Sequence, residues 1–201
     1  MLDGILTLLE NYTVKKIIIS KQTNESENYI SFKRIVKEKN LEVIEVNKGD
    51  RLKIEKDIYI DILWPDNENT IKDNELNNNS IVCKLYYSDF SILFTGDIEE
   101  LAEKEIIEEY ASYSNILKST ILKVAHHGSK SSSIQQFIKN VDPKIALIGV
   151  GEDNKFGHPS GEALQRLEEK NVRIYRTDKN GEITFKINKK GKIISIQKCI
   201  N

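Results

Sequence analysis

Aspartate and histidine stand at three points of the chain where hydrophobic segments end. Asp97 closes segment 93–97, His126 and His127 follow the hydrophobic segment at 120–125, and His158, the third and last histidine, lies in a Gly-His-Pro sequence. Carboxylate and imidazole groups suit zinc or manganese. The pattern therefore indicates a divalent-metal site. The competing interpretation is an ordinary turn in which Asp97 caps the helix that follows.

Hydrophobic periodicity predicts the elements that must position these side chains. Apolar residues at helical spacing predict helices over 3–12, 27–39, 98–110, 134–141 and 161–170. Shorter apolar or alternating segments predict strands over 15–20, 42–46, 51–54, 59–63, 81–87, 90–95, 120–125, 145–150, 172–175, 182–188 and 192–197. Residues 66–80 are rich in Asn and Asp and predict a long surface loop. Ser133 with Gln136 predicts a capping box for the fourth helix.

This order of elements predicts an α/β fold in which Asp97, His127 and His158 converge. Each residue ends a predicted strand or lies in the loop beyond it, so all three should reach one edge of a common sheet. At 201 residues the chain is long enough for one domain with one core, and we expect a single domain over 1–201.

Composition limits the class of protein. The longest apolar run is too short to span a membrane, and no signal peptide is visible, so the expected location of the chain as given is cytoplasmic. Cys83 and Cys199 lack CxxC spacing and are expected to be free thiols. Residues 118–201 hold 16 Lys and Arg against 8 Asp and Glu. A basic surface beside a hydrolytic site favours DNA or another phosphoester as partner, although solvated surface lysines are the simpler interpretation of the Lys189–Lys192 turn.

Five segments in order, 93–97, 122–129, 142–150, 156–160 and 175–185, resemble the successive motifs of the metallo-β-lactamase-fold domain of ComEC-type DNA-uptake proteins. The resemblance covers nearly the whole chain. It implies a four-layer αββα sandwich, classed as α/β or by some schemes α+β. It also implies a site for one or two ions of zinc or manganese at the sheet edge, and metal-dependent hydrolysis of phosphoesters such as DNA.

The chain departs from this family at its start. Such domains carry an HxHxDH motif before a helix resembling Leu2–Leu6, and Met1 takes the place of the motif's last residue. The resemblance thus implies that the first strands and most ligands are missing. One interpretation is a fragment of a membrane-associated or extracytoplasmic protein, with impaired activity and self-association through an exposed sheet edge. The other is a catalytically inactive binding or interaction module.

The resemblance also implies roles for individual residues. Asp97 and His127 are the expected metal ligands, and His126 is a further ligand or touches phosphate from beside the metal. Asp97 and His158 are the expected catalytic residues, with His158 protonating the leaving oxygen or contacting phosphate.

The remaining assignments concern substrate binding and a replaced ligand. Ser129, Lys130 and His158 are the expected phosphate contacts, beside the N–H groups of the helix that begins near Ser133. The alternatives are solvated loop residues for Ser129 and Lys130, and a histidine that rigidifies its loop for His158. Residues 78–80, Asn-Asn-Ser, occupy a position where related domains carry another metal-binding histidine.

Overall fold

A computed structural model of the chain describes residues 2–113 and 115–199. These residues form two compact units, Met1–Asn47 and Lys48–Asn201, which are described one at a time. Met1, which the resemblance compares with the last residue of the missing motif, lies outside the described residues. The expectation of a single domain over 1–201 stays a prediction.

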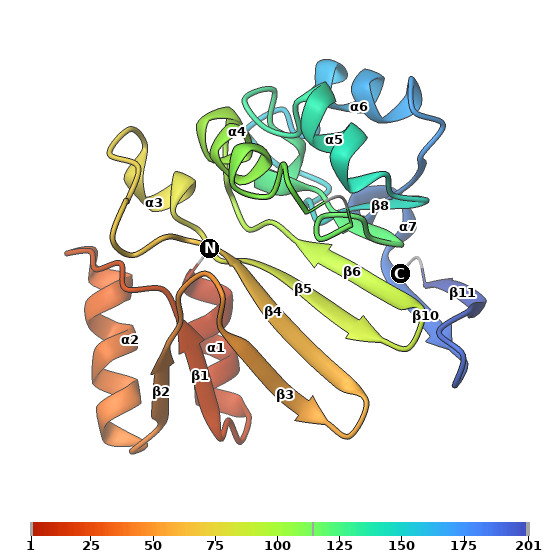
Figure 1. Ribbon diagram of the computed structural model, residues 1–201. Coiled ribbons are helices and arrows are strands. Elements are labelled where there is room, and N and C mark those ends of the chain that lie inside the picture. The colour runs from red at the N-terminus through yellow and green to blue at the C-terminus, as the bar shows by residue number, and fades with distance from the viewer. Residues whose placement is uncertain (1, 114, 200–201) are drawn as a thin grey trace. The chain divides into compact units, whose positions relative to one another are not determined.

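The first unit is a small α/β structure (Figure 1). Strands β1 (Lys16–Ile19) and β2 (Glu42–Glu45) pair in parallel. Helix α1 (Leu2–Asn11) precedes β1 in sequence, and helix α2 (Glu27–Glu38) precedes β2. A core of Leu9, Phe32 and Ile35 joins the two helices to the strands. All four elements lie where the apolar periodicity predicts them.

The second unit is built on a seven-stranded mixed sheet with the strands in sequence order, β3 to β9. β3 to β6 pair antiparallel, and β6 to β9 pair in parallel. The strands are β3 (Arg51–Glu55), β4 (Ile58–Trp64), β5 (Val82–Tyr87), β6 (Phe90–Phe94), β7 (Ile121–Lys123), β8 (Ile145–Ile148) and β9 (Arg173–Arg176). Because β6, β7 and β8 run in one direction, their carboxyl ends lie at one edge of the sheet.

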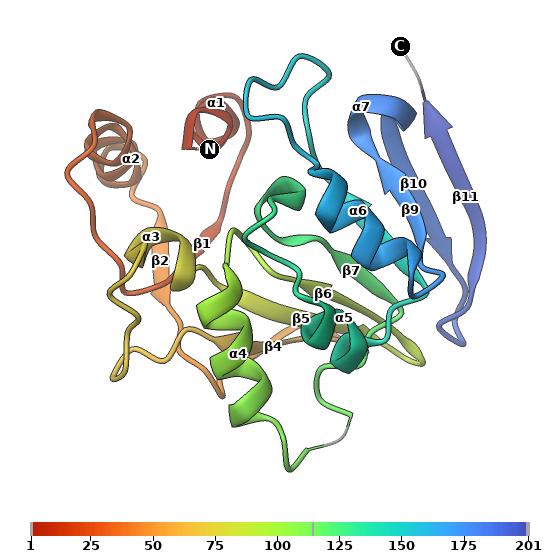
Figure 2. The same cartoon turned by 90° about the horizontal axis from the view of Figure 1, so that it is seen from above.

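The two faces of this sheet are covered differently (Figure 2). Helices α4 (Glu100–Glu109), α5 (Gln135–Val141) and α6 (Gly161–Glu168) pack on one face, and the hairpin of β10 (Glu182–Ile187) and β11 (Ile193–Cys199) packs on the other. Alternation along β7 shows this division, since Leu122 belongs to the helix-side core and Ile121 to the hairpin-side core. The fold is therefore mixed α/β with flanking helices. The four-layer sandwich stays a prediction.

Two short helices fall where the sequence predicts none. Helix α3 (Glu75–Asn78) lies inside the predicted loop 66–80, and α7 (Thr177–Asn180) joins β9 to β10. Four residues are too few to produce a helical period in the sequence. In the part of the chain that the structure describes, no helix is both long and apolar enough to cross a membrane. Cys83 and Cys199 are free, as expected, and burial raises the pKa of the Cys83 thiol to about 11.

Lys84 on β5 is a buried cation that holds the connection between α4 and β7. Its side chain is almost fully buried, and burial lowers its pKa to about 8. Its Nζ donates to the carbonyl oxygens of Ile116, at 2.8 Å, and of Lys118. Its ammonium group also lies 4.7 Å from the centre of the Tyr86 ring. The lysine therefore supplies donors to carbonyl groups that lack a strand partner.

We expect Lys84→Met to lower the free energy of unfolding by about 1–3 kcal/mol at pH 7, because buried carbonyl oxygens lose their donor. Urea unfolding measures this change. Lys53→Met is the matched control, since Lys53 is exposed on β3. Equal stability of the two variants would show that Lys84 has no such role.

Candidate metal centre

The loops that follow β6, β7 and β8 are bonded to one another at the carboxyl edge of the sheet. Thr95 Oγ1 donates to the carbonyl oxygen of Lys123 at 2.6 Å, and the backbone N–H of His126 donates to the carbonyl oxygen of Gly96 at 3.1 Å. The parallel register places Phe94 beside Lys123. Asp97 and the histidine pair are therefore brought to the same edge by strand pairing.

The histidine pair lies in a turn with an unusual backbone. A short 3-10 segment (Ala125–Gly128) follows β7, and His126 and His127 have φ values of 47° and 55°. Gly128 continues the left-handed run with φ 83°, and a Cβ there would lie 2.6 Å from the Cβ of Pro159. The carbonyl oxygen of Gly128 accepts the N–H of Ser160 at 2.9 Å. Glycine is thus required where the His158 loop meets the histidine turn.

Two hydrogen-bond acceptors, His127 Nε2 and Asp97 Oδ1, face each other. His127 Nδ1 lies 2.6 Å from the carbonyl oxygen of Gly149, which can only accept, so Nδ1 carries the proton of the neutral ring. The unprotonated Nε2 then faces Asp97 Oδ1 at 3.8 Å. The Asp97 side chain is 8% exposed. Two lone pairs facing each other favour a cation between them, either a proton or a metal ion.

His126 and His158 form the outer part of the cluster. Their ring centroids are 5.6 Å apart in an edge arrangement. His126 Nδ1 lies 3.2 Å from Glu99 Oε1, which is within ion-pair distance. The two atoms are not aligned for a hydrogen bond, and Nδ1 has no hydrogen-bond partner among the described residues. Glu99 Oε1 accepts the hydroxyl of Ser131 at 3.2 Å. Glu99 therefore stands behind His126 as an acidic neighbour.

The His158 loop is held by Asn154, not by the histidine ring. Asn154 Oδ1 accepts the N–H of His158 at 2.9 Å, and its Nδ2 donates to the carbonyl oxygen of the same residue at 2.8 Å. The ring stacks on the exposed Phe156 at 6.0 Å. Burial, with smaller contributions from the neighbouring His126 and His127, lowers the pKa of His158. The neutral ring therefore prevails at pH 7.

The helix-cap interpretation of Asp97 is wrong. Helix α4 begins at Glu100 with Glu99 as its N-cap residue, and that position has no side-chain cap. The residues at 78–80 are structural: Asn78 is fully buried, its Oδ1 accepts the N–H of Glu99 at 3.0 Å, and its carbonyl oxygen accepts Trp64 Nε1–H at 2.7 Å. This asparagine fixes the start of α4 beside Asp97.

The predicted capping box at Ser133 is also wrong. Ser133 has φ 57°, Ile134 is the N-cap residue of α5, and Ser133 Oγ has no hydrogen-bond partner among the described residues. The fully buried Glu103 of α4 acts instead: its carboxylate accepts the N–H groups of Ser133, at 2.5 Å, and of Ile134, at 2.8 Å. These N–H groups are therefore not free to bind phosphate.

Ser129 and Lys130 continue from the histidine turn. Ser129 is buried and its Oγ lies 3.0 Å from the hydroxyl of Ser131. Lys130 has an exposed side chain, and its carbonyl oxygen accepts Arg166 Nη2–H at 3.2 Å. Arg166 on α6 also donates to the carbonyl oxygens of Ser132 and Ser133 at 2.8 Å. The expected phosphate contacts of Ser129 and Lys130 stay predictions.

The donor set fits one side of a metal ion. Asp97 offers a carboxylate and His127 a ring nitrogen whose partner nitrogen is already oriented, as metal-binding histidines require. Within residues 2–113 and 115–199, no group of three His, Cys, Asp or Glu side chains is placed to hold an ion. Zinc sites use at least three protein ligands, so Asp97 and His127 by themselves are fewer than such a site needs.

This chain is similar in sequence to known competence proteins. It is 32% identical over 179 residues to ComE operon protein 3 of Bacillus subtilis, covering 89% of this chain and 22% of that protein. It is 28% identical over 134 residues to Competence protein ComA of Neisseria gonorrhoeae, covering 67% and 18%. The chain is homologous to competence proteins over most of its length.

The similarity extends to a recombination protein and covers only part of each relative. Recombination protein 2 of Haemophilus influenzae is 26% identical over 180 residues, which is 90% of this chain and 20% of that protein. The chain spans about a fifth of the length of the curated relatives it matches. No protein-family profile matches it.

The residues that hold these loops together were not predicted from the sequence. Glu103 and Arg166 lie on helices that also carry several other charged residues, and Asn154 lies in a polar loop. The available signal for Glu103 was its position between Ala102 and Ile106, two residues that the sequence predicts to face the sheet. Asn154 and Arg166 bond backbone groups distant in sequence or across a loop, which leaves no periodic signal.

Glu103 provides a pH-dependent test of this arrangement. Burial raises its pKa to about 7, so the folded state binds a proton more tightly than the unfolded chain does. The free energy of unfolding should therefore rise as the pH falls from about 7 to 4.5, by on the order of 2–3 kcal/mol. Glu103→Gln should lose this slope. Chemical unfolding at a series of pH values measures it.

The control is Glu105→Gln, which removes an exposed carboxylate from the same helix. It should keep the wild-type slope between pH 4.5 and 7. Identical pH profiles for both variants would contradict the assigned role of Glu103.

Proposed function

We propose that this chain contributes Asp97 and His127 to a divalent-metal site that hydrolyses phosphoester bonds in DNA during uptake or processing. The observation that carries the proposal is the placement of His127 Nε2 and Asp97 Oδ1 3.8 Å apart, with the histidine oriented by Gly149. Neither atom has a proton to offer the other when the ring is neutral. Zinc or manganese, as one or two ions, suits this pair of ligands.

The relation to competence proteins supports DNA as the substrate class. The basic balance of residues 118–201 is consistent with a phosphate-rich partner. A bound divalent ion supplies Lewis-acid activation of water and of the phosphoryl group. As part of a longer competence protein, the chain would act in a membrane-associated or extracytoplasmic setting.

The remaining histidines have roles set by their surroundings. His126, beside Glu99, is held as a further ligand or phosphate contact. His158 faces His126 from a loop fixed by Asn154, and its neutral ring offers one N–H donor and one acceptor to a phosphoryl or leaving oxygen. Ser129 and Lys130 complete the proposed substrate contacts.

A second candidate function is that of a catalytically inactive binding or interaction module. The absence of a three-ligand group within the described ranges, 2–113 and 115–199, favours it. Activity measurements on ligand variants distinguish the two, because only a hydrolase depends on Asp97 and His127.

The proposal includes pairing between copies of the chain through a sheet edge. β3 and β9 are the edge strands of the seven-stranded sheet, and Ile54 on β3 is 51% exposed. An uncovered edge presents backbone groups to a second strand. Sedimentation velocity of the purified chain at increasing concentration measures this association.

We expect the chain alone to bind zinc weakly, because two ligands, or three with His126, do not make a stable site. Isothermal titration calorimetry should give an affinity that falls further in Asp97→Asn and in His127→Gln. Asp89→Asn is the control, since Asp89 lies in an exposed turn. Tight stoichiometric binding, unchanged in the Asp97 and His127 variants, would place the site elsewhere.

Natural transformation tests the function in a whole protein. The part of ComE operon protein 3 that matches this chain can be replaced by this chain in Bacillus subtilis. We expect the chimera to support transformation, and Asp97→Asn or His127→Gln to lower its frequency by roughly tenfold or more.

The matched control is again Asp89→Asn, which should transform like the parent chimera. If the Asp97 and His127 variants transform equally well, the hydrolase proposal fails and the binding module is favoured. Manganese-dependent cleavage of DNA by the purified chimera, lost in the same variants, supplies the biochemical counterpart.

A further inference from the structure

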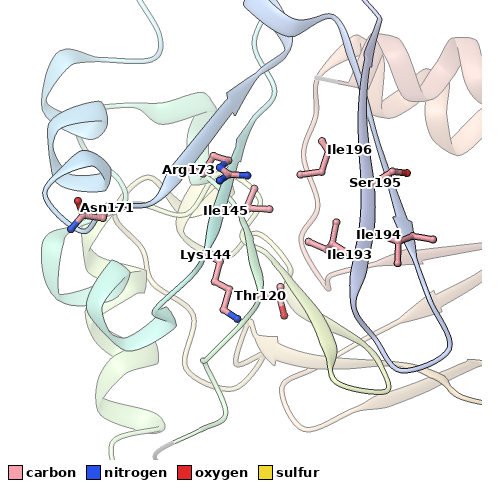
Figure 3. A pocket seen from close by; sticks show the side chains of 9 residues that line it. All are labelled: Thr120, Lys144, Ile145, Asn171, Arg173, Ile193, Ile194, Ser195 and Ile196. Carbon is pink, nitrogen blue, oxygen red and sulfur yellow. The ribbon is translucent and has the colours of Figure 1, made fainter.

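A cavity of about 450 Å³ lies far from the histidines, at the opposite ends of the parallel strands. Thr120 stands directly before β7, whereas His126 and His127 follow it. Figure 3 shows Thr120, Lys144, Ile145 and Arg173 on the sheet side of the cavity, facing strand β11 of the hairpin. The volume is in the range of small-molecule sites.

The far wall of the cavity is apolar. Ile193 and Ile196 on β11 point across it toward Ile145 (Figure 3) and pack against the hairpin-side core. Ile145 is 6% exposed. A ligand in this cavity would therefore place one side against branched aliphatic groups.

Two cations, Lys144 and Arg173, line the sheet side of the cavity, and their charged ends point in different directions (Figure 3). Arg173 begins β9, and its backbone N–H donates to the carbonyl oxygen of Lys144, the residue directly before β8, at 3.1 Å. Both side chains are exposed, and neither has a hydrogen bond or ion pair with another residue that the structure describes. None of the described residues lining the cavity is acidic.

This lack of a counter-charge contrasts with the other arginines of the second unit. Arg51 pairs with Asp61 and Arg176 pairs with Asp178, and Arg166 donates to three carbonyl oxygens. Two cations without an acidic partner give the cavity a positive potential, which favours binding of an anion. Arginine beside lysine suits a phosphate, which the guanidinium can bind with two parallel hydrogen bonds.

Thr120 adds a directed polar group. Its Oγ1 accepts the N–H of Ser91 at 3.3 Å, which leaves its hydroxyl proton available to a ligand oxygen. The cavity thus combines two cations, one hydroxyl donor and an apolar wall. A terminal phosphate carries close to two negative charges at pH 7 and matches two cations better than a single carboxylate does.

We propose that this cavity binds the terminal phosphate of a nucleotide, with the sugar and base against Ile193 and Ile196. The phosphate belongs to a free mononucleotide or to the phosphorylated end of a DNA strand, which present the same chemistry. The site is separate from Asp97 and His127, and it does not require the proposed hydrolase activity.

Binding is measured by calorimetry on the full chain with three probes: thymidine monophosphate, a 5′-phosphorylated tetrathymidylate and the same oligonucleotide without the phosphate. We expect the phosphorylated probes to bind, and Lys144→Gln and Arg173→Gln each to weaken binding roughly tenfold. Binding of the mononucleotide identifies the free-nucleotide source. Binding of the phosphorylated oligonucleotide alone identifies a strand end.

The double variant Lys139→Gln, Lys186→Gln removes two positive charges, one more than either test variant, from exposed positions outside the cavity and should bind like wild type. Asp97→Asn should also bind like wild type, which separates this inference from the proposed function. The inference is overturned if no phosphorylated probe binds, or if the control double variant weakens binding as much. It is also overturned if the unphosphorylated probe binds equally well, or if inorganic phosphate competes as well as the mononucleotide.

Discussion

The parallel register of β6, β7 and β8 is the constraint on which the candidate metal centre depends. Ile92 lies beside Ile121, and Ile121 lies beside Ile145, so the three strands end almost level. Each apolar strand is thereby buried on both faces while its polar continuation emerges at a common edge. Asp97 and His127 are 30 residues apart in sequence, and this pairing brings the loops that carry them together, with 3.8 Å between Asp97 Oδ1 and His127 Nε2.

A second set of contacts keeps these strand-end loops in place. The segment after the histidine turn is held from α4 by the carboxylate of Glu103 and from α6 by the guanidinium of Arg166. Both charged groups bond backbone atoms of the loop, and the hydroxyl of Ser132 adds a bond to the carbonyl oxygen of Ile98 at 2.7 Å. Burying Glu103 has a cost in solvation, which its raised pKa records. Burial of the Glu103 carboxylate is therefore unfavourable by itself, but its two hydrogen bonds order the segment at Ser133 and Ile134.

The sequence predicts the elements well because their apolar spacing is regular. Nearly every long helix and strand was predicted, and the order of strand ends was enough to bring Asp97 to the histidines. Polar contacts were not predicted, because nothing in local spacing shows that Glu103 bonds Ser133 or that Asn154 holds the His158 loop. The capping-box prediction failed for the same reason: the distant carboxylate of Glu103 accepts the N–H of Ser133, which the Gln136 side chain would accept in a capping box.

The left-handed backbone of the histidine turn limits which residues can occupy it without strain. This conformation costs about 1–2 kcal/mol for an ordinary residue, and asparagine tolerates it better. The chain uses asparagine for it at Asn40, Asn74 and Asn171. Replacing His127 by asparagine would therefore relax the backbone while removing an imidazole. The chain thus places two imidazoles side by side on a backbone that asparagine would adopt with less strain.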